Sequence, residues 1–172
     1  MMSPDLRKLA LTAHVTASVG WLGAVAGFMA LAVAALTTRN TQTVHAAYVA
    51  MELTASNVIV PLSFASLLTG LIQSLGTKWG LFRHYWVVAK LFINLFANAV
   101  LLMYMPTLRY LARIAAEGNP TVADTGGLRD ASAVLHSGAA LLLLLVATVL
   151  GVYKPRGLTR YGWRKQRAPA AT

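Results

Sequence analysis

The stretch of sequence that decides the fold is HYWVVAKLFINLFANAVLLMYM, which runs from His84 to Met105. It is long enough to cross a bilayer as a helix, since a span needs about 20 predominantly apolar residues. Lys90, Asn94 and Asn98 interrupt it at intervals of four residues, so they share one face of that helix. An unpartnered lysine in hydrocarbon costs about 2.5–3.5 kcal/mol. We therefore expect this face to turn toward other helices and away from lipid.

The rest of the chain has the same membrane character. Of its 172 residues, 57% are hydrophobic and 12% are charged, whereas a soluble domain has about 25% charged residues. Three further apolar stretches run over Leu9–Leu36, Thr41–Leu75 and Ala131–Tyr153. The first is longer than the apolar region of a secretory signal, which has about 7–15 residues. The sequence predicts an all-α, four-helix transmembrane bundle over residues 1–153 and a basic tail over residues 154–172.

Prolines and glycines predict local features of these helices. Pro61 is expected to kink the second stretch, because proline removes one helix hydrogen bond, and the crossing itself is expected over Asn57–Leu75. Beyond Pro106 the third helix either ends or continues as far as Ala116. Gly23 and Gly27 form a pair of small residues that permits close contact with a neighbouring helix.

The distribution of basic residues predicts the orientation in the membrane. Four crossings put both termini on one side, which carries ten Lys and Arg residues against four on the other. Positive residues stay cytoplasmic, so both termini are expected inside, at the bacterial inner (plasma) membrane. The net charge of +10 is thus explained by orientation, and nucleic acid is not an expected partner. The expected partners are the bilayer and anionic lipids at the basic tail. The attraction between such lipids and a basic segment is worth roughly 1 kcal/mol per basic residue near the surface.

Ionisable residues within apolar helices are the candidates for a functional site. We interpret His14, Lys90 and His136 as candidate cofactor-binding residues, His14 and His136 as candidate metal ligands, and Glu52, Asn94 and Asn98 as a polar lining. Each has an alternative role: the histidines and asparagines as hydrogen-bonded helix contacts, Lys90 as a residue that extends toward the cytoplasmic interface, and Glu52 as a solvated boundary carboxylate. His14 and His136 are expected to differ in depth by roughly 10 Å or more, so one metal ion is not expected to bind both.

The sequence lacks the residues or motifs that several classes of site require. The chain has no cysteine, which excludes a disulfide, a thiolate zinc site and a cysteine-ligated iron–sulfur cluster within it. It also lacks a nucleophile elbow, a phosphate loop and a dinucleotide-binding glycine pattern. No catalytic residue is therefore assigned, and the sequence does not decide whether the protein is an enzyme. A homo-oligomer and a larger membrane complex are both compatible with it.

The order of these features resembles a known group of membrane proteins. The first helix, LALTAHVTASVGWLGAV, the second, NVIVPLSFASLLTGLI, and the third, GLFRHYWVVAKLFINLFANAVLL, resemble copper-resistance protein D-like domains and HemJ-type protoporphyrinogen oxidases. The chain is most similar to small actinobacterial-type four-helix integral membrane proteins within that broader group. The resemblance covers about residues 9–105. It implies a four-span fold and association with haem b or copper, with His14 and Lys90 at the functional positions.

The chain departs from the HemJ-type enzymes in two places. After Trp21 it has a small, aliphatic segment from Gly23 to Leu31 where those enzymes have an aromatic-rich stretch, and it lacks their Asn-Glu-Pro entry to the fourth helix. The resemblance therefore does not carry the oxidase reaction over. The leading hypothesis is a haem-associated, redox-active membrane protein. The alternatives are a transport or metal-handling module and a structural or assembly subunit.

Overall fold

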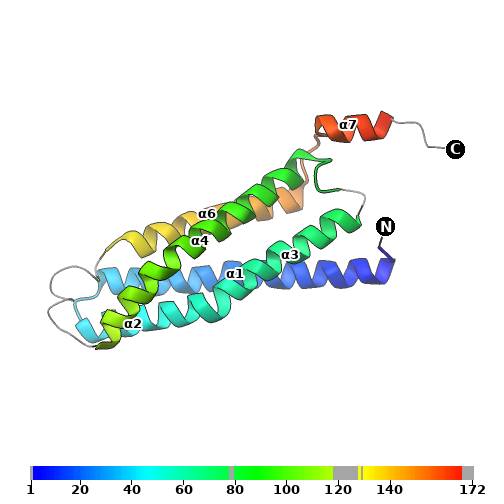
Figure 1. Cartoon of the computed structure of the whole chain (residues 1–172). Coiled ribbons are helices and arrows are strands. Elements are labelled where there is room, and N and C mark those ends of the chain that lie inside the picture. The colour runs from blue at the N-terminus through cyan, green and yellow to red at the C-terminus, as the bar shows by residue number, and fades with distance from the viewer. Residues whose placement is uncertain (1, 78–79, 118–127, 129, 168–172) are drawn as a thin grey trace.

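The computed structural model describes residues 2–77, 80–117, 128 and 130–167. Most of these residues are helical (Figure 1), and the helices have the bounds α1 Pro4–Thr37, α2 Thr41–Thr54, η1 Ala55–Ile59, α3 Val60–Gly76, α4 Tyr85–Glu117, α6 Ser132–Tyr153 and α7 Arg160–Arg167. Four helical segments are long and apolar enough to cross a membrane: α1, the continuous run Thr41–Gly76, α4 and α6. The predicted all-α, four-helix, multi-pass architecture is confirmed.

Polar side chains cap the first turns of α1 and α2. The Ser3 hydroxyl accepts a hydrogen bond from the Leu6 amide at the start of α1, and the Asn40 side chain accepts one from the Thr43 amide at the start of α2. Such caps satisfy amides that have no partner inside the helix. Only residues 38–40 separate α1 from α2, so these two helices are antiparallel neighbours.

The second span changes its helical type just before Pro61. It is an α-helix over α2, a π-helix over η1 and an α-helix again over α3, with Pro61 in the first turn of α3. Proline has no amide hydrogen and its ring collides with the carbonyl four residues earlier, and a wider π turn accommodates both effects. The predicted irregularity at Pro61 thus takes the form of a π turn. The whole run Thr41–Gly76 is helical, and the crossing over Asn57–Leu75 stays a prediction.

The four spans form a bundle with α1 and α4 at diagonal corners. Each of these two helices packs against the second span and against α6. The core between them is apolar and includes Trp21, Phe28, Tyr48, Met51 and Leu108, all 5% exposed or less. α4 continues unbroken through Pro106 to Glu117, which decides between the two predictions for that helix.

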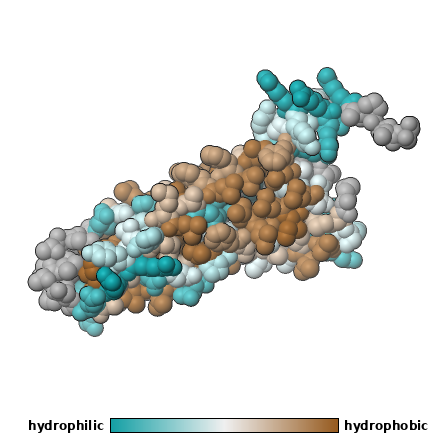
Figure 2. Space-filling model, in the orientation of Figure 1, coloured by the Kyte–Doolittle hydropathy of each residue, from teal (hydrophilic) through white to brown (hydrophobic). Residues whose placement is uncertain are grey.

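The two ends of the bundle differ. α1 begins, α6 ends and α7 lies at the same end, as Figure 1 shows. In Figure 2, hydrophobic residues cover most of the visible face between the two ends, whereas α7 is hydrophilic. The surface is therefore suited to a lipid environment. The assignment of the α7 end to the cytoplasm stays a prediction, and the short helix within the basic tail was not predicted.

The small-residue pair of α1 does not form a helix contact within the chain. Gly23 and Gly27 are both exposed, and no atom of the described residues lies within 4 Å of where a Cβ of either glycine would stand. Gly20 is the α1 glycine that approaches a neighbour, because its Cβ would lie 3.1 Å from the Leu62 side chain. The contact between α1 and α3 thus uses a different glycine from the predicted pair.

Candidate functional site

His14 lies half-buried between α1 and α3, at the end of the bundle where α7 lies. Its Nδ1 is 3.1 Å from the Ser66 carbonyl oxygen and 3.1 Å from the Thr69 hydroxyl. The Thr69 hydroxyl itself donates to the Ala65 carbonyl, so both neighbours of Nδ1 are acceptors. Nδ1 therefore carries the proton, and Nε2 of the neutral ring carries the lone pair. Gly70 makes room for the ring, because a Cβ there would lie 3.1 Å from His14 Cε1.

Two groups of hydrogen-bonded side chains, one of which includes His14, lie on three spans, and we call this set the polar seam: His14, Ser18, Ser63, Ser66, Thr69, Asn94 and Asn98. The Ser18 and Ser66 hydroxyls are 2.8 Å apart. One turn along α3, the fully buried Ser63 donates to Asn98 Oδ1 of α4 over 2.8 Å. The Asn98 amide then donates to the side chain and backbone of Asn94. The hydrogen bonds of the seam matter because burying a polar group without a partner in an apolar bundle costs free energy.

Lys90 lies on α4 one turn from Asn94, half-buried and facing α6. A Cβ at Gly151 would lie 2.9 Å from its Nζ, so the glycine leaves space for the ammonium group. Like His14, Lys90 lies toward the end of the bundle where α6 ends, since Gly151 is two residues from the end of that helix. No hydrogen bond or ion pair to its ammonium comes from the described residues. The structure therefore brings His14 and Lys90 to one end of the bundle interior, from diagonal helices.

His136 lies in the first turns of α6, near the opposite end of the bundle. Its ring stacks on Tyr104 with the ring centroids 4.3 Å apart, and its Nδ1 is 2.8 Å from the Ser132 carbonyl. The side chain is exposed. His14 and His136 thus have separate surroundings, and nothing brings them to one site. Within the described part of the chain, no three His, Asp or Glu side chains are grouped so that they could hold a metal ion.

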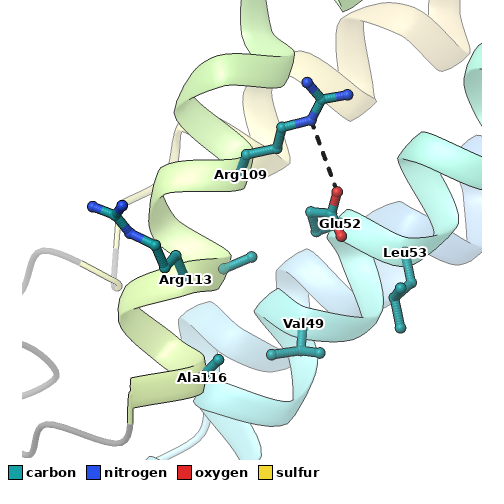
Figure 3. A pocket seen from close by; sticks show the side chains of 7 residues that line it. Val49, Glu52, Leu53, Arg109, Arg113 and Ala116 are labelled. Carbon is teal, nitrogen blue, oxygen red and sulfur yellow. Dashed lines mark ion pairs between the residues drawn. The ribbon is translucent and has the colours of Figure 1, made fainter.

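Glu52 lies in a groove of about 330 Å³ at the end of the bundle away from α7. Figure 3 shows it on the second span opposite Arg109 of α4, with Arg113 one turn further along. Glu52 Oε1 is 3.9 Å from Arg109 Nε and accepts a hydrogen bond from Ser56. The Glu52 side chain is 24% exposed and that of Arg109 is 65% exposed. The carboxylate is thus paired within the chain and does not line the same region as Asn94.

Sequence analysis found the seam residues of α4 but only part of their partners. The partners on α3 are not among the candidate site residues, although Ser63, Ser66, Gly70 and Gln73 follow one another at helical spacing. This spacing, with Ser66 included, predicts a polar face on the helix, and in the structure that face contacts α1.

Comparison of the chain with protein-family models, with curated proteins and with solved structures gives no match. The resemblance to copper-resistance protein D-like domains and HemJ-type oxidases therefore stays a prediction.

Gly70→Val is expected to destabilise the protein by about 1–3 kcal/mol, because a branched side chain would push the His14 ring out of its place between α1 and α3. The measurement is the free energy of unfolding in detergent. Gly138→Val is the matched control, since no atom of the described residues lies within 4 Å of a Cβ at Gly138. Equal losses for the two variants would contradict close packing of His14 on Gly70.

Proposed function

We propose that the protein is a haem-associated integral membrane protein of the bacterial inner membrane, with its site at His14 and Lys90. The observation that carries this proposal is the hydrogen bonding of His14. A metal-binding histidine commonly donates its other ring N–H to a carbonyl or carboxylate, which fixes the tautomer and the ring orientation. Nδ1–H of His14 does this toward Ser66, and Nε2 is left as the nitrogen that can bind iron.

Lys90 is a second residue whose chemistry fits a haem. A haem brings two propionates, and an ammonium group is a suitable counter-charge for one of them. Lys90 lies toward the same end of the bundle as His14, and Gly151 leaves space beside its Nζ. In this proposal His14 would bind the haem iron through Nε2, and Lys90 would pair with a propionate. A bound haem would supply one-electron redox chemistry, while the chain would hold the group in an apolar, water-poor bundle.

The test is an absorption spectrum of the full chain, purified in mild detergent from cells supplied with haem. We expect a Soret band that is lost in His14→Ala, while His136→Ala keeps it, because His136 lies in separate surroundings. Lys90→Gln is expected to retain less haem per protein. A colourless wild-type protein, or an unchanged Soret band in monodisperse His14→Ala, would refute the proposal.

A second candidate function is that of a structural or assembly subunit. The hydrogen bond between Ser63 and Asn98, together with that between Ser18 and Ser66, supports it, because such bonds are a common means of holding membrane helices together. In that case the wild-type protein is colourless, and His14→Ala changes its stability alone. The same purification therefore distinguishes the two functions.

A further inference from the structure

A groove of about 840 Å³ lies between the start of α4 and the segment that follows α6. Arg83, His84 and Trp86 line one side, and Lys154, Arg156 and Trp163 line the other. None of the described residues that line it is Asp or Glu. The described lining of the groove therefore combines three basic side chains with two indole rings.

Backbone hydrogen bonds hold the two sides of this groove together. Leu158 forms an antiparallel bridge with His84. The Thr159 amide donates to the Arg83 carbonyl over 3.0 Å, and the Tyr85 amide donates to the Gly157 carbonyl over 3.3 Å. Gly162 is buried against the same Arg83 carbonyl, and a Cβ there would collide with it. The groove is thus built by the fold and is more than a chance approach of two flexible segments.

Lys154 directs its side chain into the groove from a backbone conformation that usually favours glycine. It ends α6 in the left-handed region, with φ of 45°. Glycine is the residue preferred at that place, because it has no Cβ to disfavour the conformation. A lysine there accepts a backbone cost that glycine would not have, and its side chain lines the groove.

The place of the groove identifies the kind of ligand. It lies where two membrane spans end, beside Tyr85 of α4 and Tyr153 of α6. Tryptophan rings prefer the level of the lipid headgroups, and arginine and lysine bind phosphate through charge-assisted hydrogen bonds. We infer that this groove is a discrete binding site for the phosphate headgroup of one anionic phospholipid. This goes beyond the diffuse attraction of a basic tail, because it assigns one headgroup to a defined set of side chains.

The experiment compares variants that remove equal charge from different places. The full chain in neutral detergent is titrated with dioleoylphosphatidylglycerol or dioleoylphosphatidylcholine, and bound lipids are counted by native mass spectrometry. The wild-type protein is expected to retain one phosphatidylglycerol in preference to phosphatidylcholine. The double variant Lys154→Gly with Arg156→Gln is expected to bind it roughly tenfold or more weakly. The double variant Lys165→Gln with Arg167→Gln removes the same charge from residues that do not line the groove, and it is expected to bind nearly as the wild type does.

One further variant and one competition experiment test the same site. Gly162→Ala keeps every charge but displaces α7 from the Arg83 carbonyl, and it is expected to weaken phosphatidylglycerol binding as well. Inorganic phosphate is expected not to displace the lipid, since it lacks the acyl chains that a site at the end of two spans would contact. Equal weakening by both charge-removing double variants would show diffuse attraction and overturn the inference. Displacement by inorganic phosphate would show a site for soluble anions and would likewise overturn it.

Discussion

Replacement of Trp21 by alanine is expected to lower the free energy of unfolding by about 3–5 kcal/mol, the usual cost of truncating a buried aromatic residue. Trp21 is 2% exposed and lies in the core cluster of the bundle. In a membrane protein the loss comes chiefly from van der Waals contacts, because lipid tails are as apolar as the core. The measurement is unfolding of the purified protein in mixed micelles with increasing sodium dodecyl sulfate.

Phe92→Ala is the matched control for Trp21→Ala. Phe92 is 70% exposed on the surface of α4, so truncating it removes few contacts within the chain. We expect it to change the free energy of unfolding by less than about 1 kcal/mol. Similar losses for the two variants would contradict the assignment of Trp21 to the packed interior.

Ser63→Leu is expected to destabilise the protein by about 2–4 kcal/mol, through overpacking and the loss of one interhelical hydrogen bond. Ser63 is 0% exposed, so a larger side chain must displace its neighbours. The substitution also leaves Asn98 Oδ1 without its partner on α3. The same unfolding measurement applies, and Thr148→Leu is the control, because the exposed Thr148 hydroxyl donates to the Leu144 carbonyl of its own helix.

A double-mutant cycle then isolates the bond between Ser63 and Asn98. Combining Ser63→Ala with Asn98→Ala should give a coupling energy of about 0.6–1.7 kcal/mol, as is typical of polar contacts between membrane helices. A coupling energy near zero would show that the two residues do not depend on each other. The polar seam would then have no role in holding α3 on α4.

The helices could be predicted from the sequence because membrane spans are set by length and apolarity alone. α1 and α6 begin and end within a few residues of the predicted stretches Leu9–Leu36 and Ala131–Tyr153. The short helix α7 could not be found in this way, because it is polar and only eight residues long. Its place depends on backbone bonds to Arg83, which no local pattern predicts.

The surroundings of single side chains were harder to predict than the helices. Gly23 and Gly27 match a common contact motif, yet they face outward, because helix rotation is set by the sum of contacts along α1. The position of Arg109 relative to Glu52 depends on whether α4 continues past Pro106. Once it does, Arg109 faces Glu52 across the groove, whereas an earlier end would have left it in a loop. Whether His14 and Lys90 both turn toward the bundle interior similarly depends on how two diagonal helices rotate.

The bond between the Arg83 carbonyl and the Thr159 amide has a consequence for biogenesis. The two residues are separated in the chain by α4 and α6, so the bond cannot form until the fourth span has been translated and inserted. Closure of this junction is thus a late event in synthesis, one that marks a nascent chain whose crossings are all in place.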